Sequence, residues 1–308
     1  MQIVITGGTG TIGRALTALL TSEGHDVVIL SRNPKAHLNM EADGVAIKKW
    51  QVESLVGWGP LIDGADVVVN FAGENLAGDK FFPDRWNDTK KQRISESRIA
   101  AGQAVNQAIK KAQKKPAVLI QASAIGYYGP RGDEVVTETS EPGQDFLSNI
   151  CVEWESTTAP VEELGVRRVI IRTGLILTTD SGPLAKLLVP FKLFAGGPFG
   201  SGKQWWSWIH LEDVVKAVRF LMENKSASGP INLTAPNPTT NREFSKELGR
   251  VMFRPSFVPL PAFVMKLAIG DAATLVLDGQ RVIPQRLQQL GFSFSYPDLN
   301  LALRDLLD

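Results

Sequence analysis

The sequence predicts an α/β fold: a doubly wound parallel sheet followed by a smaller C-terminal lobe. Three observations support this prediction. Short apolar runs alternate with segments of helical spacing through the first half of the chain, the pattern of a sheet covered by helices on both faces. Most of these runs are continuously apolar, as strands buried on both faces are. The first run ends at a cluster of glycines where a helical pattern begins at once.

Six strands and two helices are predicted in the first half. The strands are Gln2–Thr6, Asp26–Leu30, Val45–Trp50, Ala65–Phe71, Ala117–Ala122 and Arg168–Thr173. A first helix is predicted from Thr11 to Glu23 and a long one from Arg85 to Lys114, where apolar residues recur at three- and four-residue steps. Asp84, after Pro83, is predicted to be the N-cap of the long helix.

Beyond residue 175 the elements become shorter. Glycine and proline punctuate the chain at Pro190, 196–198, 200–202 and Pro230. Helices are predicted over 211–224, 241–252, 262–277 with a break near Gly270, and 299–307. We therefore expect residues 1–175 to form most of one domain. Residues 176–308 should form most of a smaller lobe whose segments interleave with the last strands of the sheet.

The glycine cluster predicts a dinucleotide site. Residues 8–13 read GTGTIG, a G-x-G-x-x-G pattern between a strand and a helix. A pyrophosphate bound there lies against backbone N–H groups at the helix N-terminus, where side chains are not tolerated. The alternative is a turn without a ligand, but a turn alone rarely needs three glycines at this spacing. The first domain is therefore expected to be Rossmann-type, with cofactor contacts at Gly7, Gly10, Thr11, Ile12 and Gly13.

The end of the second strand indicates which cofactor binds. A site for NAD places Asp or Glu about 20 residues past the glycines, where the carboxylate accepts a hydrogen bond from the ribose 2′-OH. This chain has Ser31 and Arg32 there. An arginine pairs bidentately with a 2′-phosphate, and no carboxylate repels that phosphate. The sequence therefore favours NADP(H); the alternative for Arg32 is a solvated surface side chain.

Composition excludes several other classes. The chain has 33 Lys and Arg residues and 32 Asp and Glu residues. This nearly neutral balance does not favour nucleic acid as a partner. The single cysteine, Cys151, and three histidines predict no metal site and no disulfide, which fits a reducing, cytoplasmic setting. No run approaches the ~18 apolar residues of a membrane span, so no membrane contact is expected. The oligomeric state is left open.

Three motifs resemble those of the extended short-chain dehydrogenases/reductases: TGGTGTIG at 6–13, NFAG at 70–73 and HLED at 210–213. Further segments, including RWN at 85–87, GYYG at 126–129 and VIPQR at 282–286, resemble one subgroup of that family. Its members are called epimerase family proteins and are labelled as NADP-dependent sugar-nucleotide epimerases, although their physiological reaction is not established. The resemblance covers nearly the whole chain. It implies that the smaller lobe lies on the substrate side.

The resemblance also implies further cofactor contacts. These are Phe71, Ala72, Gly73, Glu74, Arg98, Gly174, Leu175 and Ile176. The small residues after the fourth strand let the adenosine-side backbone approach, and backbone groups after the sixth strand hold the nicotinamide amide. Glu74 has two alternatives, capping a turn or contacting a substrate hydroxyl. The alternative for Arg98 is an exposed helix arginine.

The family's catalytic residues are missing. The family uses Ser, Tyr and Lys to exchange a proton with the substrate oxygen. Here Ala124 stands at the serine position, and Leu147 and Cys151 stand at the tyrosine and lysine positions; a one-residue shift gives Phe146 and Ile150 instead.

Two tyrosines after the fifth strand offer a substitute. Tyr127 or Tyr128 is a candidate acid, although either side chain could instead serve packing. His210, flanked by Ile209 and Leu211, is expected to be a hydrogen-bonded structural residue rather than a base.

Two functions follow from the sequence. The first is an NADP(H)-dependent oxidoreductase or epimerase-like enzyme with a non-standard acid–base group. It acts on an unknown small molecule, for which nucleotide-sugars are one candidate class. The alternative is a catalytically silent NADP(H)-binding module that regulates or senses redox state.

Overall fold

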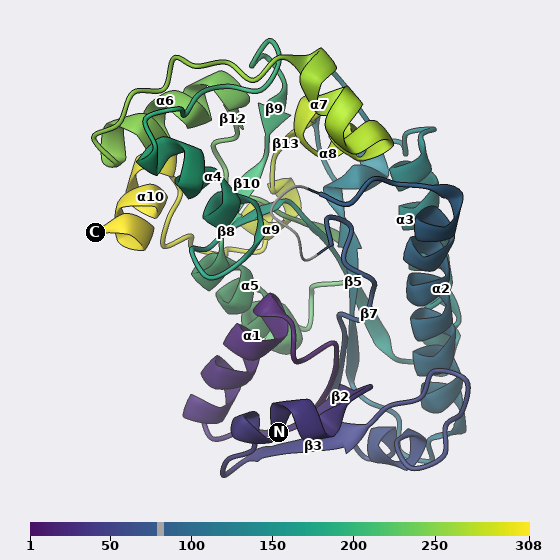
Figure 1. The fold of residues 1–308 in the computed structure, drawn as a ribbon. Helices are drawn as coiled ribbons and strands as arrows, with labels where there is room; N and C mark the ends of the chain where they lie inside the picture. The colour runs from purple at the N-terminus through teal and green to yellow at the C-terminus, as the bar shows by residue number, and fades with distance from the viewer. Residues whose placement is uncertain (79–82) are drawn as a thin grey trace.

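The computed structural model describes residues 1–78 and 83–308, and its centre is one seven-stranded sheet (Figure 1). The strand order is β11-β7-β5-β4-β1-β2-β3, and every neighbouring pair is parallel. The bounds are β1 (Gln2–Thr6), β2 (Asp26–Ser31), β3 (Val45–Lys49), β4 (Val67–Asn70), β5 (Val118–Ala124), β7 (Arg167–Thr173) and β11 (Gly229–Leu233). The predicted Rossmann-type α/β fold is confirmed.

Helices cover both faces of this sheet. α1 (Thr11–Ser22) and α5 (Leu211–Glu223) pack together on one face, where Leu16, Leu20 and Leu221 join the strands in one buried apolar cluster. α2 (Asp88–Lys111) covers the other face, with α3 (Phe146–Ser156) beside it. Successive residues of each strand point to opposite faces of the sheet, so each strand contributes to the core on both faces. This explains why the strands are continuous apolar runs in the sequence.

The smaller lobe is built from short elements around its own core, which includes Leu184, Phe191, Trp206, Trp208 and Phe244. Its strands pair in twos, β8 (Leu175–Leu177) with β10 (Trp208–His210), and β9 (Trp205–Trp206) with β12 (Thr239–Thr240). A third pair, β6 (Val135–Val136) with β13 (Arg281–Val282), attaches this lobe to the chain that follows β5. The helices here are α4 (Gly182–Lys192), α6 (Asn241–Val251), α7 (Ala262–Ile269), α8 (Thr274–Leu277), α9 (Gln285–Gln289) and α10 (Leu299–Leu307). The 3₁₀ segments of the chain are η1 (Pro34–Met40), η2 (Gly59–Ile62), η3 (Ile125–Tyr128), η4 (Ala159–Leu164) and η5 (Gly270–Ala273).

The structure corrects two details of the sequence reading. Pro230 lies inside β11 rather than between elements. Because β11 pairs only with β7 and forms the edge of the sheet, the missing N–H of the proline interrupts no central ladder. The long helix begins later than predicted, because Asn87 rather than Asp84 is its N-cap, with Asn87 Oδ1 accepting from the Lys90 N–H at 2.8 Å.

Candidate functional site

Of the four glycines in the turn between β1 and α1, Gly7, Gly8 and Gly13 leave no room for a Cβ, whereas Gly10 does. A Cβ on Gly7, whose φ is +66°, would lie 2.8 Å from the Phe71 carbonyl carbon, and one on Gly13 would lie 2.5 Å from Gly8 Cα. A Cβ on Gly10 would meet only the Gly7 oxygen, at 3.4 Å. Gly7 and Gly13 therefore allow close backbone packing, whereas Gly10 is uncrowded by the protein itself.

The N-terminus of α1 is open. Its N-cap is Gly10, which supplies no side-chain cap, and no acidic residue stands in the first turn. The unpaired N–H groups and the helix dipole favour an anion at this position. Thr11 Oγ1 lies 2.8 Å from the hydroxyl of Ser181, the residue before α4, and half-buried Ile12 packs into the core. The turn is thus held between the sheet and the smaller lobe.

A buried polar ladder fixes the end of β4 beside this turn. Thr6 Oγ1 donates to Asn70 Oδ1 at 2.6 Å, and Asn70 Nδ2 donates to Gln121 Oε1 at 2.9 Å. The Ala72 N–H in turn donates to Thr6 Oγ1 at 3.3 Å. Because these bonds join β1, β4 and β5, residues 71–73 lie where the sequence expects the adenosine-side backbone to approach.

Near the end of β2, three basic side chains surround the carboxylate of Glu74. Ser31 is buried and Arg32, directly after it, is exposed. Glu74 Oε1 lies 3.0 Å from Lys90 Nζ and 3.7 Å from Arg93 Nη2. The hydrogen bond from Lys90, with the charges of Lys90, Arg93 and Arg32, lowers the pKa of Glu74. Glu74 is therefore ionised. Because three cations surround this one carboxylate, the region beside the end of β2 has a net positive charge.

Arg98 closes the same region from α2. A Cβ on Gly73 would lie 3.3 Å from Arg98 Cγ, so the absence of that atom lets the arginine cross over the backbone. Its Nη1 donates to the Ile94 carbonyl at 3.0 Å, and its guanidinium lies 5.1 Å from the centre of the Trp154 ring. Burial lowers the pKa of Arg98. Arg98 is thus half-buried against the end of β4, in contrast to an exposed helix arginine.

Residues 174–176 follow β7 at the same edge of the sheet. The Gly174 N–H donates to the Leu233 carbonyl at 3.0 Å and the Leu175 N–H to the Ser207 carbonyl at 2.8 Å. Ile176 pairs with Ile209 in the β8–β10 ladder. Because the N–H groups of Gly174 and Leu175 already donate to protein carbonyls, a ligand at these residues would contact other backbone atoms.

A pocket of about 510 Å³ lies between the start of α2, the start of α3 and the segment from α7 to α8. Its volume is within the usual range for small-molecule sites. Leu147, at the position that the resemblance gives to the catalytic tyrosine, is part of the wall. An ion pair of 2.5 Å between Lys91 Nζ and Asp271 Oδ2 joins α2 to the far side. Among the described residues, the lining is Trp86, Lys91, Asp145, Phe146, Leu147, Lys266, Gly270, Asp271, Ala273, Thr274, Leu277 and Asp278.

Leu147 and Cys151 lie on one face of α3, turned toward η3. A Cβ on Gly126 would lie 3.4 Å from Leu147 Cβ and 4.0 Å from Cys151 Sγ. Burial raises the pKa of Cys151 to about 11, so the thiol is neutral. Ser123 donates to Glu155 Oε1 at 2.7 Å, so its hydroxyl is committed to that buried carboxylate. None of these side chains takes the part of the family's tyrosine and lysine.

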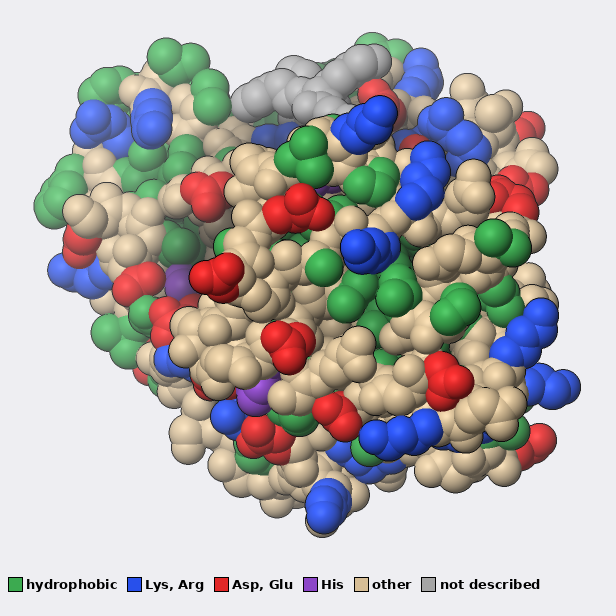
Figure 2. Space-filling model, turned by 90° about the horizontal axis from the view of Figure 1, so that it is seen from below, with side chains coloured by type: hydrophobic (Ala, Val, Ile, Leu, Met, Phe, Trp, Pro, Cys, Tyr) green, Lys and Arg blue, Asp and Glu red, His purple; other side chains and the backbone are tan. Residues whose placement is uncertain are grey.

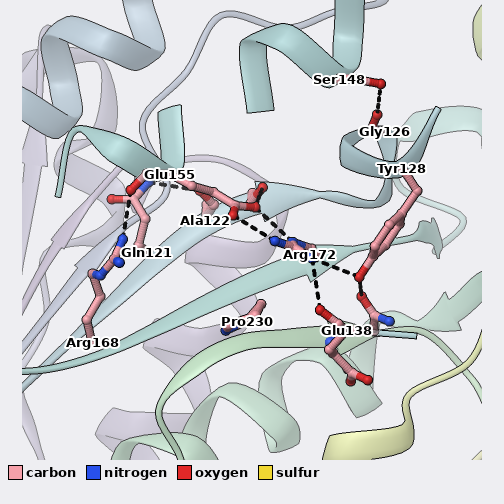
Figure 3. A network of polar contacts seen from close by, with 12 residues as sticks. Gln121, Ala122, Gly126, Tyr128, Glu138, Ser148, Glu155, Arg168, Arg172 and Pro230 are labelled. Carbon is pink, nitrogen blue, oxygen red and sulfur yellow. Dashed lines mark hydrogen bonds and ion pairs between the residues drawn. The ribbon is translucent and has the colours of Figure 1, made fainter. Parts of the chain in front are cut away.

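Tyr128 belongs to a buried polar network instead of a reactive site (Figure 3). Its side chain is 0% exposed, and its hydroxyl donates to Asn232 Oδ1 at 2.7 Å and accepts from Arg172 Nη1 at 3.0 Å. Burial raises the pKa of Tyr128 to about 12. Because the hydroxyl has no exposed surface and its bonds are made inside the protein, the structure does not support the predicted role of Tyr128 as an acid.

Tyr127 has different surroundings. It is half-buried, and its ring centre lies 3.4 Å from the guanidinium carbon of Arg172. Among the residues that the structure describes, its hydroxyl has no hydrogen-bond partner, in contrast to that of Tyr128. Of the two tyrosines named from the sequence, only Tyr127 is partly exposed and has a hydroxyl without a hydrogen bond in the described structure.

The centre of the network escaped the sequence reading. Arg172 donates from Nε and Nη2 to the two oxygens of Glu155, each at 2.9 Å, and both side chains are buried. Glu138 accepts from the Asn232 and Arg286 N–H groups, and burial raises its pKa. A charged residue within the apolar run of β7 was the available signal, since Arg172 needs a buried partner.

His210 has the structural role that was predicted. Its Nδ1 accepts from the Glu212 N–H at 3.2 Å, which caps α5, and its ring packs on Tyr296 at 4.0 Å between centres. Burial lowers the pKa of His210.

Comparisons with known proteins give one consistent result. Residues 3–233 match the model of the NAD dependent epimerase/dehydratase family, and residues 260–306 match a domain of unknown function, DUF1731. The epimerase family protein YfhF of Bacillus subtilis is 40% identical over the whole chain and 98% of its own length. The chloroplastic epimerase family protein SDR39U1 homolog of Arabidopsis thaliana is 39% identical, covering all of this chain and 87% of that protein.

Solved structures agree with these sequence matches. The crystal structure of human epimerase family protein SDR39U1 (isoform 2) with NADPH superposes with a TM-score of 0.89 at 34% identity, over 99% of both chains. UDP-glucuronic acid 4-epimerase from Bacillus cereus has a TM-score of 0.78 at 16% identity, covering 99% of this chain and 98% of that one, which shows a common fold. The chain belongs to the NAD-dependent epimerase/dehydratase family, among its epimerase family proteins.

Proposed function

We propose that this protein binds NADP(H) and acts as an oxidoreductase or epimerase-like enzyme on a small molecule, in a cytoplasmic setting. The observation that carries the proposal is the pairing of an open α1 N-terminus with an exposed Arg32 at the end of β2. The first suits a pyrophosphate and the second a 2′-phosphate. The human relative, whose structure contains NADPH, supports this choice of cofactor.

The residues fit such a cofactor along the edge of the sheet. Gly10, Thr11 and Ile12 would receive the pyrophosphate at α1, with Gly7 and Gly13 shaping the turn. Ser31 and Arg32 would receive the 2′-phosphate, with the excess cations around Glu74 adding attraction. The backbone at 71–73, Arg98 and residues 174–176 would line the remainder. Bound there, NADP(H) would supply or accept a hydride.

The substrate would enter the pocket beside Leu147. Since Ala124, Leu147 and Cys151 replace the family's proton-exchanging set, any acid must come from elsewhere. Tyr127 is the group that we assign to this role, because its hydroxyl is unbonded within the described structure whereas that of Tyr128 is buried. Solved structures of the same fold contain UDP-glucuronic acid or UDP-glucose, and we propose nucleotide-sugars as the first class to test.

Binding measurements with Arg32→Ala test the proposal. Charge-assisted hydrogen bonds to the 2′-phosphate should make the parent protein favour NADP(H) over NAD(H) by about 10- to 150-fold. Arg32→Ala should remove most of that preference by weakening NADP(H) alone, as measured by calorimetry. Lys35→Ala, another cation just after β2, is the matched control and should keep the preference. Equal affinity of the parent for both cofactors would refute the assignment.

The missing catalytic set favours one alternative, a catalytically silent NADP(H)-binding module that regulates or senses redox state. A broad panel of alcohols, ketones and nucleotide-sugars distinguishes the two functions. Turnover that falls about 10²- to 10⁴-fold in Tyr127→Phe supports the enzyme with its assigned acid. Tight NADP(H) binding without turnover of any compound supports the silent module.

A further inference from the structure

Residues 182–200 and 250–270 together form a surface, here called the apolar tip, at one end of the molecule. Among the described residues, fifteen large hydrophobic side chains are exposed, and nine of them belong to these two segments. They are Val189, Leu193, Phe194, Phe253, Phe257, Val258, Phe263, Val264 and Leu267. Exposed apolar side chains scattered singly are ordinary, whereas a gathered set marks an interaction site.

The segments of the apolar tip lie side by side. The Val258 N–H donates to the Gly196 carbonyl at 3.1 Å, and the Leu260 N–H to the Pro198 carbonyl at 2.9 Å. The guanidinium of Arg254 lies 4.6 Å from the centre of the Phe194 ring. α7 follows directly, at the top of the molecule in Figure 1. The exposed side chains therefore come from neighbouring segments of one surface.

Two of these phenylalanines occupy the same strained position. α4 and α6 both end in a motif where the next two N–H groups turn back to the last turn of the helix. The residue at the bend is Phe194 in one and Phe253 in the other, with φ of 60° and 54°, a conformation that favours glycine. Their side chains are 59% and 88% exposed, so core burial does not account for them. Strain of this kind typically accompanies function.

The segments of the apolar tip carry basic residues and no acidic ones, with one neighbouring carboxylate, Glu247, paired to Arg250 at 3.0 Å. The sequence has no Asp or Glu from 181 to 211 or from 248 to 270. Within the two segments the charged residues are Lys186, Lys192, Arg250, Arg254 and Lys266, in a chain whose net charge is only +1. The opposite end of the molecule, seen in Figure 2, has Asp and Glu interspersed with Lys and Arg. Positive charge is thus concentrated where the apolar side chains are.

We propose that the apolar tip docks on an anionic lipid surface. Exposed Phe and Leu side chains would enter the boundary between headgroups and acyl chains, while the basic residues pair with lipid phosphates. A second copy of the chain is a poorer occupant, because two tips would bring like charges together. No described helix is long and apolar enough to cross a membrane, so the protein would lie on the surface. Such docking departs from the sequence expectation of no membrane contact, which rested on the absence of a spanning segment.

Flotation with lipid vesicles tests the charge requirement. The protein should float with vesicles of phosphatidylcholine mixed with phosphatidylglycerol and stay behind with phosphatidylcholine alone. Lys192→Glu combined with Arg254→Glu should weaken partition at least about tenfold, since each basic residue near such a surface contributes severalfold. Lys110→Glu with Lys111→Glu, at the end of α2, makes the same change in net charge elsewhere and should leave partition unchanged.

The strained phenylalanines give a second, independent test. Phe194→Gly with Phe253→Gly removes both side chains and relieves both bends, so vesicle partition should fall at least about tenfold while the unfolding temperature is maintained or rises. Val56→Ser, at another highly exposed apolar position, is the control that should still float. NADP(H) affinity should stay as in the parent, which keeps this test separate from the proposed function.

Three results would overturn the proposal. One is a parent protein that ignores anionic vesicles, and another is equal binding to neutral and anionic vesicles. The third is a lipid-free dimer, seen by sedimentation velocity, that dissociates in the Phe194→Gly, Phe253→Gly variant; this result would assign the apolar tip to a second copy of the chain.

Discussion

At the scale of single residues, Gly10 and Gly13 of the β1–α1 turn have separable roles. Gly10→Val should leave the fold intact, at a cost of about 1–3 kcal/mol, because its Cβ meets only one atom within 3.4 Å. The branched side chain should abolish NADP(H) binding by filling the place of the pyrophosphate. Gly13→Ala should instead destabilise the protein, because its Cβ overlaps Gly8. Circular dichroism and cofactor titration measure both effects; a Gly10→Val protein that binds normally would contradict the proposed phosphate site.

The two adjacent tyrosines should respond differently to loss of the hydroxyl. Tyr128→Phe leaves Asn232 Oδ1 without its donor and removes one hydrogen bond of Arg172, which keeps its pair with Glu155. The change should lower the free energy of unfolding by about 1–3 kcal/mol. Tyr127→Phe removes no hydrogen bond found in the described structure and keeps the ring over Arg172, so its effect should stay within about 0.5 kcal/mol. Urea denaturation gives both values. Equal losses would mean that the network does not depend on Tyr128.

At the scale of elements, the start of α5 should make stability depend on pH. Burial lowers the pKa of His210, so the folded protein holds the neutral ring while the unfolded chain binds a proton near its ordinary pKa of about 6.5. The stability that depends on this neutral ring is present above pH 6.5. It is lost as the pH falls below that value, with a slope that approaches 1.4 kcal/mol per pH unit.

His210→Asn separates capping from titration. Asparagine is a good N-cap and does not titrate, so the variant should keep α5 but lose the packing on Tyr296. It should be less stable at pH 8 and show a shallower loss of stability between pH 6.5 and 5. Thermal unfolding across that range supplies the comparison, and an unchanged slope would assign the acid sensitivity to other groups.

At the scale of the whole molecule, Asp213 attaches the C-terminal segment to α5, which packs on the sheet. It is 0% exposed, and its two oxygens accept from the Ser295 and Tyr296 N–H groups at 2.7 and 2.9 Å. Asp213→Asn turns one acceptor into a donor that faces an N–H, which should cost about 1–3 kcal/mol and expose 295–308 to proteolysis. Glu212→Gln, one residue earlier and only half-buried, loses the same charge and should cost less than about 1 kcal/mol. Similar protease resistance in both variants would contradict this role.

Local sequence patterns predicted most strands of the sheet, but they did not predict the contacts that join one element to another. Continuous apolar runs located six of its strands, and a strand containing Pro230 was missed because proline usually interrupts pairing. The Glu155–Arg172 pair joins α3 to β7, so it becomes visible only when the strand order is known. The pocket gathers residues from three distant segments. For the apolar tip the sequence predicted a helix over 262–277 but not its exposed side chains, because a sequence pattern does not reveal which apolar faces remain uncovered.

The late position of β11 has a consequence for synthesis of the chain. β7 ends at residue 173, whereas its partner on the outer side begins only at residue 229. While the ribosome adds the intervening segment, the backbone of β7 is an open sheet edge able to pair with another nascent chain. Products that terminate before β11 should therefore aggregate, and the growing protein should depend on chaperones until the edge is closed.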